Sequence, residues 1–154
     1  MLRQSKEEYF IRMLELVCSR STCLRRSVGA IVTDAAGHVL STGYNGTPAG
    51  FEHCAKSSPC PGWQDQQGDT RRCLAVHAEQ NALLQCQRLD LAHTMYVSCC
   101  PCFTCAKMIL NTSIQRVVAV TPYTGDGGQE LLAVQRKLYY YDFETSKPVA
   151  YSPV

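Results

Sequence analysis

The alternation of apolar and polar residues divides the first part of the chain into one helix and a pair of strands. Apolar residues recur at helical spacing behind a Ser5-x-x-Glu8 capping box, which predicts an amphipathic helix over residues 6–20. Two β-branched, apolar runs at 27–34 and 39–45 flank the turn sequence AAGH. We therefore expect a β-hairpin after the first helix.

The second half of the chain alternates between strands and helices. Pro101 suits the first position of a helix, because its missing N–H would have no partner there. The pattern predicts, in chain order, a helix at 77–88, a strand at 93–99, a helix from 101, a strand at 116–123, a helix at 129–138 and a strand at 139–144. This order predicts a single α/β domain over residues 1–154, a three-layer α/β/α sandwich around a mixed sheet of about five strands.

A long segment at 46–75 interrupts this pattern. It is rich in Gly, Pro, Ser, Asp and Gln and shows no period. Loops of this length are uncommon in compact domains unless something holds them in place. Cysteines are spaced along the segment, so a metal ion that orders the loop is one way to hold it.

Composition and charge narrow the class of protein. The 154 residues suit one core, and the formal net charge of +2 includes no block of like charges. We therefore expect neither a nucleic-acid coat nor a polybasic membrane anchor. The start MLRQSKEEYF lacks the apolar core of a secretory signal, and no apolar run approaches a membrane span. We expect a cytoplasmic protein.

The ten cysteines point to metal chemistry, because disulfides are rare in cytosolic proteins. Cys102 and Cys105 are three residues apart at a predicted helix start, so both sulfurs can reach one ion. His77, at the start of another predicted helix, can supply a third ligand. One of the four tetrahedral positions of zinc then remains for water, as in catalytic sites. Glu79 lies near the metal without being needed as a ligand, and its carboxylate can move protons.

His77-x-Glu79 followed by Pro101-Cys102-x-x-Cys105 is the pattern of the zinc-dependent deaminases. The alternative is a purely structural zinc knuckle with Cys99 or Cys100 as fourth ligand. Cys99 and Cys100 end a strand and should point to opposite sides. We expect Cys100 to line the pocket and Cys99 to pack in the core.

Four further stretches extend the match beyond the catalytic motifs. These are VGAIV at 28–32, GYNGTPAG at 43–50, HAEQNALL at 77–84 and TPY at 121–123. In order and spacing they resemble the deoxycytidylate (dCMP) deaminases of the zinc-dependent cytidine deaminase superfamily, over about residues 5–140. The resemblance implies that His77, Cys102 and Cys105 hold Zn²⁺. Glu79 would carry a proton from the bound water to the cytosine ring, so that dCMP becomes dUMP and ammonia, supplying dUMP for thymidylate synthesis.

The resemblance also implies a second, structural zinc in some members. Their two recognisable ligands match Cys23 and Cys54 here. The spacing adds Cys60 and Cys73 as the remaining ligands, with His53 as the alternative to one cysteine. The other possibility is that these residues are free or buried thiols.

Substrate and regulatory contacts are implied in the same way. Arg26 is the candidate phosphate contact, Asn45 the sugar contact and Tyr123 a pocket-lining residue, each with a plain structural role as its alternative. Many members are hexamers, activated by dCTP and inhibited by dTTP with Mg²⁺, at a site that includes Gly43, Tyr44, Asn45 and Gly46. The rival functions are another zinc deaminase, acting on a riboflavin precursor, a tRNA adenosine or single-stranded DNA, and a zinc-binding module without catalysis.

Overall fold

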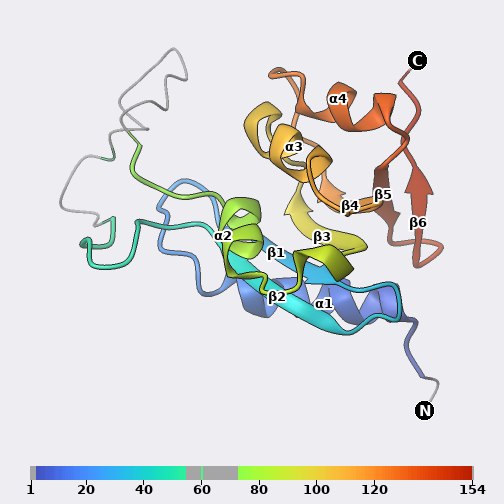
Figure 1. Cartoon of the computed structure of the whole chain (residues 1–154), viewed down its shortest axis with the longest axis horizontal. Coiled ribbons are helices and arrows are strands. Elements are labelled where there is room, and N and C mark those ends of the chain that lie inside the picture. Colours follow the sequence, from blue (N-terminus) through green and yellow to red (C-terminus); the bar gives the residue numbers. More distant parts are fainter. Residues whose placement is uncertain (1–2, 55–59, 61–72, 154) are drawn as a thin grey trace.

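One mixed sheet of six strands forms the centre of the molecule (Figure 1). The computed structural model describes residues 3–54, 60 and 73–153. The strands are β1 (Gly29–Thr33), β2 (Val39–Tyr44), β3 (Thr94–Cys99), β4 (Arg116–Thr121), β5 (Leu138–Asp142) and β6 (Lys147–Ala150). They lie in the order β2-β1-β3-β4-β5-β6, where the β3–β4 and β4–β5 pairs are parallel and the others antiparallel.

Helices cover both faces of this sheet, because neighbouring strand residues face opposite sides. The helices are α1 (Lys6–Cys18), α2 (Ala78–Gln85), α3 (Phe103–Leu110) and α4 (Gly128–Val134), with a short 3-10 turn, η2 (Leu89–Leu91). Val32 and Val97 belong to the core under α2, α3 and α4, whereas Ile31 and Tyr96 pack against α1. The fold is therefore the predicted α/β/α sandwich, with six strands instead of about five.

Close packing fixes α2 against β2. A Cβ atom on Gly43 would lie 2.2 Å from the Ala78 carbonyl oxygen and 2.4 Å from the Ala82 nitrogen. On either side of this contact, Ser41 Oγ donates to the Ala82 carbonyl at 2.7 Å and Asn81 Nδ2 donates to the Tyr44 carbonyl at 2.8 Å. These contacts fix the position of α2 relative to β2.

Three details differ from the predicted elements. Pro101 precedes Cys102, the N-cap of α3, so its placement at the first helical position was wrong. The last helix is shorter than predicted, because Arg136 adopts a positive φ of 53° that a helix cannot continue through. The sequence did not indicate β6, which contains Pro148 and lies at the sheet edge, where a missing N–H is tolerated.

The predicted loop at 46–75 lies partly outside the described residues, which omit 55–59 and 61–72. In its described part, Gly46 pairs with Val76 through two backbone hydrogen bonds of 3.2 and 2.8 Å. This bridge brings the end of the loop beside its beginning. Within the described ranges, no helix has the length and apolar character needed to cross a membrane.

Candidate active site

Two of the predicted metal ligands are the N-cap residues of helices. His77 precedes α2 and Cys102 precedes α3, and Cys105 follows in the first turn of α3. Strand β3 runs directly into this turn, so the sheet fixes where α3 begins. The positive end of each helix dipole therefore lies at the ligand cluster, where it favours thiolates.

The three ligand atoms are spaced as zinc requires. His77 Nδ1 lies 3.5 Å from Cys102 Sγ and 3.4 Å from Cys105 Sγ, and all three atoms lie within 4.8 Å of one another. Tetrahedral zinc with bonds of about 2.3 Å to sulfur and about 2.0–2.1 Å to nitrogen holds N and S about 3.5 Å apart. The residues fit Zn²⁺ with one coordination position left over.

A contact between Cys102 and Cys105 shifts the pKa values of both thiols in opposite directions. A hydrogen bond from Cys105 is the largest cause that lowers the pKa of Cys102, to about 4. The same contact, followed by burial, raises the pKa of Cys105. Hydrogen bonding to Cys102 also raises the pKa of His77. The thiolate form of Cys102 is therefore favoured, and metal binding to thiols is coupled to the release of their protons.

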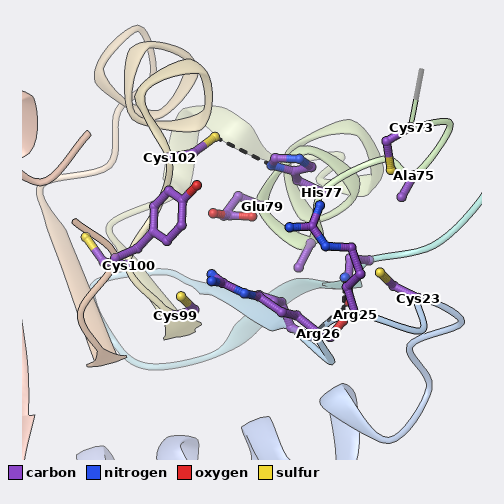
Figure 2. Close-up of a pocket in the computed structure, with 14 residues that line it drawn as sticks. Cys23, Arg25, Arg26, Cys73, Ala75, His77, Glu79, Cys99, Cys100 and Cys102 are labelled. Carbon is purple, nitrogen blue, oxygen red and sulfur yellow. Dashed lines mark hydrogen bonds between the residues drawn. The ribbon is translucent and has the colours of Figure 1, made fainter. Parts of the chain in front are cut away.

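Glu79 places a carboxylate beside this cluster with almost no contact with solvent. It is 4% exposed, and burial raises the pKa of its carboxyl to about 7. Figure 2 shows its oxygens pointing into the cavity, next to the Cys102–His77 pair. A carboxyl group held there is suited to taking up and releasing a proton in a reaction.

A cavity of about 190 Å³ joins the metal cluster to a basic wall. His77, Glu79 and Cys102 lie on one side, and the guanidinium groups of Arg25 and Arg26 lie across from them (Figure 2). The remaining lining residues are Cys23, Val28, Asn45, Cys73, Ala75, Ala78, Cys99, Cys100 and Tyr123. Cationic groups facing a metal cluster suit a small anionic substrate.

Asn45 builds this basic wall. Its Oδ1 accepts from the Val28 N–H at 2.8 Å and from the Ser21 hydroxyl at 2.6 Å, and its Nδ2 donates to the Arg26 carbonyl at 2.8 Å. The Arg26 guanidinium lies 5.1 Å above the centre of the Tyr123 ring. The structural role of Asn45 is therefore present.

The structure places the other predicted residues in two groups. Cys23 and Cys73 line the same cavity, whereas Cys54 and Cys60 are not among its lining residues. Burial, followed by the charges of Cys60, Cys23 and Cys73, raises the pKa of Cys54. Among the described residues, only His77, Cys102 and Cys105 bring three ligand atoms within 4.8 Å of one another. The alternative ligand His53 is exposed.

The predicted regulatory residues lie apart from the cavity, with the exception of Asn45. Gly43 packs on α2, and Gly46 pairs with Val76. Tyr44 is 37% exposed, with the Arg20 guanidinium 6.0 Å above its ring.

One prediction about the paired cysteines was wrong. Cys99 lines the cavity together with Cys100 instead of packing in the core. Cys100 lines the cavity and is also buried: it is 3% exposed, and burial raises the pKa of its thiol to about 11. The simple alternation of a strand does not apply, because β3 ends at Cys99 and the chain turns toward α3.

Sequence reasoning missed Gln80. Its Oε1 accepts from the His77 N–H at 2.9 Å, and its Nε2 lies 3.9 Å from Met108 Sδ in α3. It thereby links the two helices that carry the ligands. The signal was available, because a Gln three residues after an N-cap is half of a capping box.

The fold and this site define a zinc-dependent hydrolytic enzyme, with three protein ligands and a buried carboxylate in one cavity. The model of the family described as "Cytidine and deoxycytidylate deaminase zinc-binding region" matches residues 4–121. The chain belongs to this family, which confirms the resemblance inferred from its motifs.

Relatives and solved structures agree with that assignment. The chain is 43% identical to the deoxycytidylate deaminase of Mycobacterium phage D29, over 77% of this chain and 96% of that protein. It is 39% identical to that of Saccharomyces cerevisiae over 82% of this chain, but it spans only 41% of the yeast protein's length. The dCMP deaminase of cyanophage S-TIM5, solved with dCMP and dUMP, superposes with a TM-score of 0.70 at 28% identity, covering 91% of this chain and 99% of that one.

Proposed function

We propose that the chain catalyses the hydrolytic deamination of dCMP to dUMP and ammonia. The observation that carries the proposal is the buried Glu79 carboxylate beside the His77, Cys102 and Cys105 cluster, in a cavity whose opposite wall holds Arg25 and Arg26. The amino-bearing ring of dCMP fits the side with Glu79 and the metal cluster, and its phosphate fits the arginine wall. The relatives named deoxycytidylate deaminase, and the phage enzyme solved with dCMP and dUMP, support this substrate.

Glu79 performs the proton transfers in this mechanism. His77, Cys102 and Cys105 would hold the ion, and Zn²⁺ would supply a water of lowered pKa as the nucleophile. Glu79 accepts a proton from that water and delivers it to N3 of the cytosine ring, which makes C4 electrophilic. The water oxygen bonds to C4, and Glu79 then takes the second proton of that oxygen and passes it to the amino nitrogen. The C4–N bond breaks, so that ammonia leaves and the C4 carbonyl of dUMP remains. The buried position of Glu79 protects these steps from exchange with bulk solvent.

We assign the substrate contacts to the basic wall. Arg26 binds the phosphate, since its guanidinium faces the cavity and Tyr123 holds it in place. Asn45 binds the sugar, and Tyr123 lines the cavity beside Arg26. Replacing Arg26 by Ala should raise KM for dCMP and leave KM for deoxycytidine, which lacks the phosphate, unchanged.

We further propose a structural zinc held by Cys23, Cys54, Cys60 and Cys73. The electrostatic influence of the other three on the pKa of Cys54 supports this set, and the exposure of His53 favours the four cysteines over the His53 variant. Metal analysis of the purified protein should give two zinc ions per chain, and one in Cys60→Ser. One zinc in the unmodified protein would exclude the second site.

Regulation remains part of the same proposal. We infer a cytoplasmic hexamer that provides dUMP for thymidylate synthesis. dCTP activates it and dTTP inhibits it, with Mg²⁺, at a site that includes Gly43, Tyr44, Asn45 and Gly46. Gly43 and Asn45 support it by position, because they link the surface of β2 to α2 and to the basic wall. Kinetics with dCTP and sedimentation would test this part, and a monomer insensitive to dCTP would refute it alone.

The main test is a spectrophotometric assay of dCMP against CMP, cytidine, deoxycytidine, a tRNA and single-stranded DNA. We expect dCMP to have the highest kcat/KM. Glu79→Gln should retain zinc and lower kcat by about 10²–10⁴-fold. Preference for a polynucleotide would favour another deaminase of this family. Turnover of no substrate by a protein with full zinc content would favour the non-catalytic module.

A further inference from the structure

The first turn of α3 lacks the usual cap. An N-cap side chain normally accepts a hydrogen bond from a backbone N–H of its own helix. Cys102 occupies this position and makes no such bond, because its sulfur faces His77 Nδ1 at 3.5 Å. The residue that should fix the start of α3 is thus engaged in the ligand cluster.

Asp126 supplies the missing acceptor from the loop between β4 and α4. Its Oδ2 accepts from the Phe103 N–H at 2.9 Å, and its Oδ1 accepts from the Gly128 N–H at 3.0 Å. Phe103 is the first residue of α3, next to Cys102. One carboxylate therefore bridges the start of α3 and the start of α4, two helices that lie side by side (Figure 1).

The backbone at Gly128 also packs closely against Pro101 and Cys102, in the turn that carries the ligand cysteines (the ligand turn). A Cβ atom on Gly128 would lie 2.4 Å from the Pro101 carbonyl oxygen and 2.6 Å from the Cys102 carbonyl carbon. Only a glycine allows this approach. The Asp126 carboxylate thus holds Phe103 by a hydrogen bond, and Gly128 packs against the stretch from Pro101 to Phe103.

We propose that Asp126 is a positioning residue of the metal centre, whose carboxylate holds the first turn of α3 so that Cys102 and Cys105 stay at ligand distance from His77. The inference rests on the zinc ligands proposed above. A negative charge at the helix start also complements the dipole. Asp126 is exposed, so water can replace it as a partner of the Phe103 N–H. Its loss should therefore loosen the ligand turn without unfolding the domain.

The experiment compares zinc-loaded Asp126→Ala and Asp126→Asn with the unmodified protein. The matched control is Asp142→Ala, because Asp142 likewise accepts a backbone N–H at 2.9 Å, from Glu144, in the turn between β5 and β6. Zinc release to a chelator, and the absorption spectrum of the Co²⁺-substituted protein, report on the ligands without requiring turnover.

We expect Asp126→Ala to release zinc about tenfold faster than the unmodified protein and to alter the Co²⁺ spectrum. Asp126→Asn, which keeps one acceptor oxygen, should be intermediate. Both should lower kcat more than they raise KM. Gly128→Ala should shift the spectrum in the same direction, because its methyl group would displace Cys102.

Two outcomes would overturn the inference. In one, Asp126→Ala keeps the zinc release rate and Co²⁺ spectrum of the unmodified protein. In the other, Asp142→Ala changes both to the same extent, which would indicate general destabilisation. Neither outcome bears on the reaction, since dCMP turnover by the unmodified protein tests the proposed function separately.

Discussion

The contact between Gly43 and α2 makes a sharp prediction about how the sheet positions the catalytic helix. In Gly43→Ala the new methyl carbon would lie 2.2 Å from the Ala78 carbonyl oxygen, where ordinary contact begins at 3.4 Å. Restoring that contact requires α2 to move away from β2 by about 1.2 Å, the difference of these two distances. His77 and Glu79 lie at the affected end of α2 and would move with it.

The expected cost follows from that displacement. Overpacking of this kind lowers the free energy of unfolding by about 1–3 kcal/mol. For a chain of this size that corresponds to a Tm lower by about 2–12 °C. A misplacement of about 1 Å at a reacting group can lower kcat by about 10²-fold. The flanking bonds of α2 to Ser41 and Tyr44 would lengthen as well.

Calorimetry, zinc analysis and the dCMP assay on Gly43→Ala measure these effects. Thr42→Ala is the control, because Thr42 is the exposed neighbour on the same strand and should leave all three unchanged. A Gly43→Ala protein with unaltered Tm and kcat would refute the reasoning. Loss of the dCTP response alone, with stability intact, would show that Gly43 serves regulation and not packing.

Two other predictions test the ligands and the basic wall. Cys105→Ser should lose the catalytic zinc, whereas Cys99→Ser should retain it, because Cys99 lines the cavity outside the ligand set. Equal zinc content in the two proteins would contradict the assignment. Asn45→Ala removes three hydrogen bonds of a side chain that is 8% exposed. It should lower the free energy of unfolding by about 2–4 kcal/mol and raise KM for dCMP. An unchanged denaturation midpoint would show that the segment carrying Arg26 does not depend on Asn45.

Local pattern was enough to predict which His and Cys residues cluster in the structure and which carboxylate shares their cavity. Few kinds of site have the spacing of His77 and Glu79 followed by that of Cys102 and Cys105. Each of these two pairs lies at a predicted helix start. Helix and strand periods likewise predicted the sandwich, because burial on one face is visible as a period along the chain. The sixth strand was not visible, since an exposed edge strand with Pro148 has no such period.

What the sequence determined alone was the candidate set of ligands and the chemistry it would support, because residue identity and local spacing are properties of short segments. The tertiary structure decided which segments meet. Twenty-four residues separate His77 from Cys102, and only the packing of α2 and α3 on the same face of the sheet brings their atoms to 3.5 Å. The cap that Asp126 gives α3 depends on a contact between the start of α3 and the loop before α4. The two residues are 23 positions apart, and no local spacing rule predicts such a contact.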